Sequence, residues 1–219
     1  MLLIGNGRLI TRDPALPYLA DGAVAVEGEV IKEVGPLADL KARYPDAEFV
    51  DARGGVIMPG LINAHTHIYS GLARGLAIEG NNPTNFLEVL EGTWWNIDRH
   101  LTLDGTRASA YATVLDCIRD GVTTIFDHHA SFCEIPGSLF AIKDVCQELG
   151  MRSCLCYEVS ERDGEEKTLQ SIQENADFAK WCKEQDNDIC LLYTSCRQSG
   201  ARGPGPRGPG TRLTPPGRG

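Results

Sequence analysis

Two histidines placed two residues apart, His65 and His67, are the first candidates for chemistry in this sequence. They stand in a short apolar segment directly after a Pro-Gly break, and Leu61–His67 is predicted to be a strand. Because side chains alternate between the two faces of a strand, residues i and i+2 point the same way. The two imidazoles should lie side by side, which suits two ligands of one metal ion. The alternative is an ordinary buried strand with two hydrogen-bonded histidines.

A second group of polar residues ends the next predicted strand, Val122–Asp127, after which come His128 and His129. Lining of a pocket, metal ligation and a plain structural role all stay open for both histidines, and His128 is the candidate for substrate binding. The carboxylate of Asp127 could cap the next loop, orient a histidine or act in catalysis. His100, at a predicted helix end, is expected to be solvated.

Other charged residues allow less specific interpretations. Arg74 lies between glycines on the loop after the histidine strand. Its cation could hold an anionic group of a substrate, or it could form a structural salt bridge. The acidic run from Glu158 to Glu166 is interpreted as a solvated face at a helix start.

The elements that must position these residues fall into two patterns. The first part alternates short strands with turns, including a turn at Gly5–Gly7 and a hairpin around Glu27–Glu29. After Pro59, strands and helices alternate and the strands are continuously apolar, which indicates a parallel sheet covered by helices. Helices are predicted at residues 37–44, 84–98, 103–119, 138–149 and 165–185.

The predicted fold class is therefore α/β. A (β/α)8 barrel needs about 250 residues, so only about three βα units fit here, as a partial TIM-like barrel preceded by a small β-sandwich piece. The expected parts are a β-sandwich portion at 1–57, the start of the barrel at 58–189 and a disordered tail at 190–219. Gly, Pro and Arg dominate the tail, and this composition cannot bury a core.

Composition excludes several classes of protein. The net charge of −9 argues against nucleic-acid binding by the body of the chain, and a basic tail that binds nucleic acid is a minor alternative. No signal peptide and no apolar run long enough to span a membrane are found in the sequence. The eight cysteines include no Cys-x-x-Cys pair, which favours a reducing compartment, and we expect a cytoplasmic protein.

Two motifs carry a family resemblance. Residues 56–67, VIMPGLINAHTH, resemble the opening motif of the amidohydrolase superfamily, and residues 121–128, GVTTIFDH, resemble a second-strand motif of its cytosine-deaminase and chlorohydrolase-like branch. Residues 64–77 and 86–98 are similar to one group of aminohydrolases in that branch. The likeness covers residues 1 to about 189. Residues 190–195 instead resemble the translated end of a transposon used to prepare sequencing libraries, so the tail is expected to be non-native.

The resemblance implies a reaction and a ligand set. One divalent ion, zinc or iron, would be held by His65 and His67 together with a later histidine and aspartate. Water activated by the metal would attack an sp² carbon that bears an amino group, such as that of a heterocyclic small molecule. The resemblance also implies that Trp95 and Asp98 line the substrate pocket, with Asp where relatives have Glu. The alternative is that Trp94 packs in a helix core while Asp98 faces water.

The sequence departs from the family pattern near its end. No predicted strand lies beyond about Ile189, so the later ligands and the proton-shuttling acid are missing, and the catalytic residues are unknown. A catalytic zinc site usually has three protein ligands. We therefore expect a fragment of an aminohydrolase that is itself inactive and whose full-length parent could be a homo-oligomer. A non-catalytic βα fragment or binding module is the alternative.

Overall fold

The computed structural model describes residues 1–185 and 190–191. Its helices and strands, with a 3₁₀ turn η1 and a π-helical turn η2, occur in this order: β1 (Leu2–Ile10), β2 (Tyr18–Glu27), β3 (Val30–Pro36), α1 (Leu37–Arg43), β4 (Glu48–Asp51), β5 (Val56–Ile57), β6 (Leu61–Thr66), η1 (Ile68–Ser70), α2 (Phe86–Val89), η2 (Leu90–Trp94), α3 (Trp95–His100), α4 (Leu103–Arg119), β7 (Val122–His129), α5 (Ser138–Glu148), β8 (Arg152–Tyr157), α6 (Glu165–Glu184) and β9 (Cys190–Leu191). The chain divides into two compact units, residues 1–64 with 115–125, and residues 65–114 with the described residues from 126 onward.

The first unit contains a five-stranded mixed sheet. Its order is β3-β2-β1-β4, and β5 also pairs with β1. Strand β2 is antiparallel to β1 and β3, whereas β4 and β5 are parallel to β1. The β2–β3 hairpin turns through Gly28 at φ +61°, a conformation that glycine adopts without strain. The predicted hairpin and the predicted helix at 37–44 are confirmed.

The predicted turn at Gly5–Gly7 is wrong. Strand β1 runs unbroken from Leu2 to Ile10, and its register against β2 shifts on both sides of Gly7, with Asn6 at φ 59°. Gly5 is needed for packing, because a Cβ there would lie 2.5 Å from a methyl carbon of Leu37. Glycines that suggest a turn in the sequence therefore serve an irregular strand and a close approach of α1.

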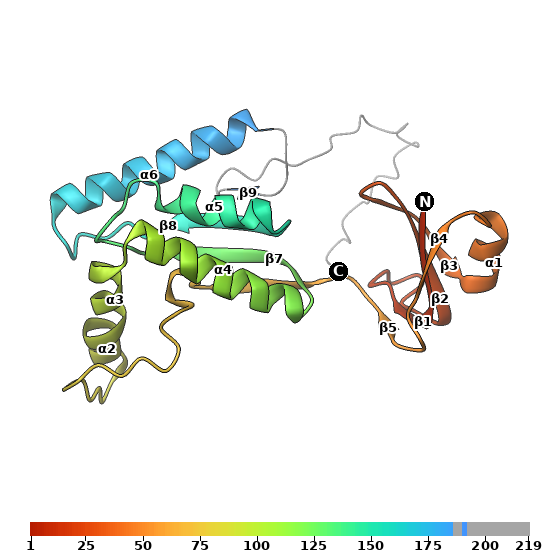
Figure 1. Cartoon of the computed structure of the whole chain (residues 1–219), viewed down its shortest axis with the longest axis horizontal. Helices are drawn as coiled ribbons and strands as arrows, with labels where there is room; N and C mark the ends of the chain where they lie inside the picture. The colour runs from red at the N-terminus through yellow and green to blue at the C-terminus, as the bar shows by residue number, and fades with distance from the viewer. Residues whose placement is uncertain (186–189, 192–219) are drawn as a thin grey trace, which may run out of the picture. The chain divides into compact units, whose positions relative to one another are not determined.

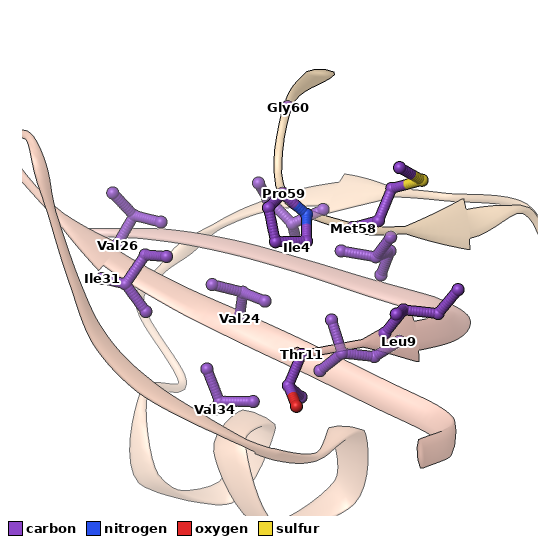
Figure 2. A pocket seen from close by; sticks show the side chains of 12 residues that line it. Ile4, Leu9, Thr11, Val24, Val26, Ile31, Val34, Met58, Pro59 and Gly60 are labelled. Carbon is purple, nitrogen blue, oxygen red and sulfur yellow. The ribbon is translucent and has the colours of Figure 1, made fainter. Parts of the chain in front are cut away.

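The two faces of this sheet reflect the two-residue alternation of its strands. On one face Leu3, Ala23 and Ala25 form a buried cluster with Leu40 of α1. Side chains of the other face surround a cavity of about 290 Å³, which Figure 2 shows; it is lined by Ile4, Leu9, Ile10, Thr11, Val24, Val26, Ile31, Val34, Ile57, Met58, Pro59 and Gly60. The described residues thus supply one sheet of the predicted sandwich piece, with a helix on one face and an open apolar face.

The second sheet has the order β6-β7-β8-β9, and β8 and β9 are parallel. Helices α5 and α6 pack against β8 and against each other (Figure 1). Gly121 and Gly150, both at positive φ, lie just beyond the ends of α4 and α5, as expected for helix C-termini. Strands and helices alternate along the chain as predicted, and three βα units precede β9.

One predicted helix is divided in the structure. Residues 84–98 were expected to form one regular helix, but α2 and α3 are separated by the π-helical turn Leu90–Trp94. A π turn contains an extra residue per turn, so it rotates the next residues of the helix about its axis. The side chain of Asn85 caps α2 by accepting from the backbone N–H of Glu88 at 3.1 Å.

Strand β9 falls within the segment that was predicted to be a disordered tail. Cys190 and Leu191 pair with Ser153 and Cys154 of β8. Residues 192–219, which include most of the segment that resembles a transposon end, lie outside the described residues. Within residues 1–185 and 190–191, no helix combines the length and the apolar character that crossing a membrane requires.

Candidate metal and substrate site

His65 and His67 lie side by side, as the alternation of a strand predicts. The Nε2 atoms of the two rings are 3.1 Å apart. The ring centroids are 5.1 Å apart and the ring planes are nearly perpendicular, at 77°. His65 belongs to β6, and His67 is the first residue after it. The strand therefore brings two imidazole nitrogens to one point.

The hydrogen bonding of His67 determines which of its ring nitrogens carries a proton. Its Nδ1 lies 3.0 Å from the carbonyl oxygen of His128, and a carbonyl can only accept, so Nδ1 donates. In the neutral ring Nε2 then carries a lone pair. This pattern, one nitrogen donating to a carbonyl and the other available, is typical of histidines that bind metals.

The separation of the two Nε2 atoms is compatible with a shared ion. Zinc–nitrogen bonds of about 2.0–2.1 Å in a tetrahedral site place two ligand nitrogens about 3.3 Å apart. The same 3.1 Å distance also suits a hydrogen bond between neutral rings. The described part of the chain contains no group of three or more His, Cys, Asp or Glu side chains that could hold a metal ion. The site therefore consists of two candidate ligands.

Asp127 of β7 holds the turn directly after the histidine pair. Its Oδ1 accepts from the backbone N–H of Ile68 at 2.6 Å, and Ile68 begins η1 directly after His67. The Asp127 side chain is buried, and burial raises its pKa to about 7 despite the hydrogen bond from Ile68. The described side-chain bond of Asp127 thus goes to the turn after β6 and not to the loop that follows Asp127 itself, which was one of the roles predicted for it.

Aromatic rings surround His67. The ring of Tyr69 lies 5.9 Å from that of His67, and the ring of Trp94 lies 5.7 Å from it. His128 is exposed, and its ring lies 5.7 Å from that of His67. Although the residue is exposed at its surface, its imidazole is partly shielded from water by neighbouring groups. This desolvation lowers the pKa of His128; Glu158 opposes the shift, and the neighbouring His67 and His65 add to it. The histidine pair is thus bordered by two aromatic side chains and one further imidazole.

The predicted substrate residues Asp98 and Trp95 both contact one arginine, Arg162. Asp98 is 1% exposed and forms an ion pair with Arg162, so the alternative in which it faces water is wrong. Burial raises the pKa of Asp98 to about 6, and Arg162 opposes that rise. The guanidinium carbon of Arg162 lies 5.2 Å from the centre of the Trp95 ring. It is Trp94, not Trp95, that contacts His67.

Arg162 is the residue that sequence reasoning missed. It pairs with Glu158 and Asp163 as well as Asp98, and its guanidinium lies 4.0 Å from the centre of the Phe132 ring. Its side chain is only 8% exposed. The available signal was a single arginine inside the acidic run of residues 158–166, which was interpreted as a solvated face. That interpretation is wrong around Arg162, where the acids neutralise a buried cation.

Two other basic residues, Arg74 and His100, are exposed. Arg74 is exposed on the loop after η1, and its Nε donates to the carbonyl of Gly71 at 3.3 Å. His100 is exposed at the end of α3, where its Nδ1 donates to the carbonyl of Asn96 at 2.7 Å. The solvated position predicted for His100 is confirmed.

His129 is fully buried and occupies a structural position. Its Nε2 lies 2.9 Å from the hydroxyl of Ser131, which itself donates to the carbonyl of Glu134. Nε2 of His129 must therefore donate. Its ring lies 5.5 Å from that of Tyr69 and 5.4 Å from that of Tyr157, and burial lowers its pKa to about 3. His129 is neutral in the folded protein.

Comparison with known proteins places this geometry in a family. Residues 56–191 match the Amidohydrolase family, and residues 22–47 match an imidazolonepropionase-like composite domain of bacteria. The first match covers more than half of the chain. The chain belongs to the amidohydrolase family.

Individual relatives are deaminases. The chain is 28% identical over 193 residues to 5'-deoxyadenosine deaminase of Methanococcoides burtonii. The match covers 88% of this chain and 41% of that protein. It is 31% identical over 183 residues to 5-methylthioadenosine/S-adenosylhomocysteine deaminase of Pyrococcus furiosus, covering 82% of this chain and 39% of that one. The chain thus spans about two fifths of the length of these curated relatives.

Solved structures share the fold. Atrazine chlorohydrolase TrzN from Arthrobacter aurescens TC1, in complex with zinc, superposes with a TM-score of 0.69 at 25% identity; the match covers 88% of this chain and 46% of that one. The predicted α/β class, with the first part of a TIM-like barrel, is confirmed.

Proposed function

We propose that this chain is the N-terminal part of a metal-dependent aminohydrolase that acts on non-peptide C–N bonds of small molecules, with His65 and His67 holding one divalent ion, zinc or iron. The observation that carries the proposal is the convergence of the two Nε2 atoms, 3.1 Å apart, with Nδ1 of His67 directed at the His128 carbonyl. The named activities of the relatives, deamination of deoxyadenosine-type and related compounds, support a heterocyclic substrate.

A divalent ion bound there supplies water with a pKa lowered from 15.7 to about 7, which makes a nucleophile available at neutral pH. The residues of this chain position the ion and the substrate and enclose the site. His65 and His67 hold the ion, while Tyr69 and Trp94 form an aromatic border that limits water at the ring of His67. Trp95, Asp98, His128 and Arg74 are the proposed contacts to substrate, and among them Asp98 is held in place by Arg162.

The chain by itself is proposed to be inactive. A catalytic zinc site usually has three protein ligands and one open position, and the part of the chain that the structure describes offers two. The same observation favours the second candidate, a non-catalytic βα module. The two candidates differ in metal binding: the aminohydrolase fragment has affinity for a divalent ion at the histidine pair, and the module has none.

The test is a zinc titration of the chain against a chromophoric chelator, beside His65→Ala, His67→Ala and the double variant. We expect weak but measurable affinity in the original chain and at least a tenfold loss in each single variant. His100→Ala is the matched control, because His100 is an exposed histidine on α3 that bonds only to its own helix in the described contacts. Equal affinity in the original chain and the double variant would reject the proposal.

A further inference from the structure

Two consecutive residues near the end of β7 form hydrogen bonds with the two residues that directly follow β6. Asp127 Oδ1 accepts from the N–H of Ile68 at 2.6 Å, and the His128 carbonyl oxygen lies 3.0 Å from Nδ1 of His67. We call Asp127 and His128 the β7 clamp. The β7 clamp therefore constrains His67 in two ways. The Asp127 side chain binds the backbone N–H of the next residue, and the His128 carbonyl binds the imidazole ring.

The two bonds have different effects on His67. The bond to Ile68 fixes the backbone from which the imidazole projects, and two further bonds, from Ser70 N and Ser70 Oγ to the His67 carbonyl, close the same turn. The bond to the His128 carbonyl fixes the rotation of the ring and keeps the proton on Nδ1. Together they leave Nε2 of His67 unprotonated in the neutral ring and directed toward Nε2 of His65.

The burial of Asp127 indicates that this bond is its principal role. Asp127 is 3% exposed and Ile68 is fully buried, so water does not compete for the bond. Burying a carboxylate destabilises the folded state unless the carboxylate is hydrogen-bonded, and an apolar side chain in the same space would not carry this desolvation penalty. Its second oxygen, Oδ2, has no hydrogen-bond partner among the described residues. The one described side-chain bond of this costly group therefore goes to the turn after His67.

We propose that Asp127 is a positioning residue of the His65/His67 site, which acts through Ile68 and, with the His128 carbonyl, presets the ring of His67 before a metal ion arrives. The inference rests on the proposed metal function, but its first prediction concerns the metal-free chain. Loss of one such supporting partner typically lowers metal affinity 10–100-fold.

The experiment measures tautomers in the metal-free chain. The sequence has five histidines, so histidine-selective ¹⁵N labelling gives few signals, and a His67→Gln variant assigns those of His67. We expect the Nδ1–H form for His67 in the original chain and in Asp127→Asn, which keeps an acceptor oxygen. In Asp127→Val, which keeps the shape and loses the acceptor, we expect a mixture of tautomers and a 10–100-fold loss of zinc affinity.

Glu174→Val is the matched control, because Glu174 is also a buried carboxylate that accepts from backbone N–H groups, at Gly137 and Leu139. It should leave the His67 signals and the zinc affinity unchanged. The proposal is overturned if the Asp127→Val variant keeps the original tautomer and affinity, if Glu174→Val changes them equally, or if His67 carries its proton on Nε2 in the original chain.

Two further outcomes are decisive. If the original chain binds no zinc, the proposed function fails, while the tautomers still decide the role of Asp127. If Asp127→Val does not fold, the spectra of the original chain and of Asp127→Asn decide it, since a changed tautomer in Asp127→Asn contradicts a role that needs only the acceptor oxygen.

Discussion

Arg162 and Asp98 form an ion pair from which water is almost excluded: their side chains are 8% and 2% exposed. The pair joins α3 to the segment between β8 and α6. Asp98 and Arg162 are 64 residues apart in the sequence. The Arg162 guanidinium also lies over the aromatic rings of Trp95 and Phe132. Breaking it should therefore affect stability more than breaking a surface pair.

We predict that Arg162→Met lowers the free energy of unfolding by about 3–5 kcal/mol, because it keeps the packing of the stem but leaves the buried Asp98 carboxylate without its cation. Urea unfolding monitored by circular dichroism measures the loss. Arg99→Met is the control: Arg99 pairs with Asp163 but its side chain is 42% exposed, so the expected loss is about 0–1 kcal/mol. Similar losses in the two variants would show that the buried Arg162–Asp98 pair contributes no more to stability than an exposed ion pair.

Asp98 should make stability fall as the pH rises. Burial raises its pKa in the folded protein to about 6 from an ordinary value of 3.8. Between these values the folded state keeps a proton that the unfolded state has lost, so the contribution is fully present below about 3.8 and is lost as the pH rises through about 6. We predict that stability relative to Asp98→Asn declines by up to about 1.4 kcal/mol per pH unit in that window. Parallel stability profiles from pH 4 to 7 would contradict this.

His129 should have the opposite effect. Its pKa in the folded protein is lowered to about 3 from 6.5. Between these values the unfolded state binds a proton that the folded state does not bind. Its contribution is fully present above about 6.5 and is lost as the pH falls toward 3. We predict a shallower loss of stability in acid for His129→Gln, which can still donate to Ser131. Urea unfolding between pH 4 and 7 measures it, with the exposed His100→Gln as a control that should behave like the original chain.

Glu174 of α6 serves as an N-cap for α5. Its two oxygens accept from the N–H groups of Gly137, at 2.7 Å, and Leu139, at 2.9 Å, whereas α5 has no capping side chain of its own. We predict that Glu174→Ala lowers the free energy of unfolding by about 1–3 kcal/mol. Glu166→Ala, which removes an exposed acid of the same helix, should change it by at most about 0.5 kcal/mol. An equal effect of the two substitutions in thermal unfolding would argue against the cap.

Features with a local signal were predictable from the sequence. The helix at 103–119 has the bounds that were predicted. Its signals are local, because an Ala-rich stretch is followed within two residues by Gly121, which ends the helix. Strand alternation predicts that His65 and His67 point the same way, and their Nε2 atoms do lie 3.1 Å apart. Gly5 was misinterpreted because a glycine marks a turn and a crowded strand equally well, and only the position of Leu37 separates the two.

Features that depend on distant contacts were not predictable. Asp98 is buried because Arg162, far along the chain, neutralises it, and nothing near Asp98 in the sequence announces that partner. Helical periodicity favoured Trp94 in a helix core, and the family resemblance favoured Trp95 at the pocket. The π-helical turn at Leu90–Trp94 changes this arrangement, and a regular period of 3.6 residues does not reveal such a turn.

The position of Trp94 gives a direct optical test of the histidine pair. Its ring centroid lies 5.7 Å from that of His67, so an ion held by His67 would change the electric field at this indole. We predict that zinc changes the tryptophan fluorescence of the chain, and that Trp94→Phe removes most of the change. Trp95→Phe and Trp181→Phe should retain it, because the rings of Trp95 and Trp181 contact Arg162 and Lys143 instead. A full response in Trp94→Phe, or any response in the His65→Ala, His67→Ala double variant, would place the bound zinc elsewhere on the chain.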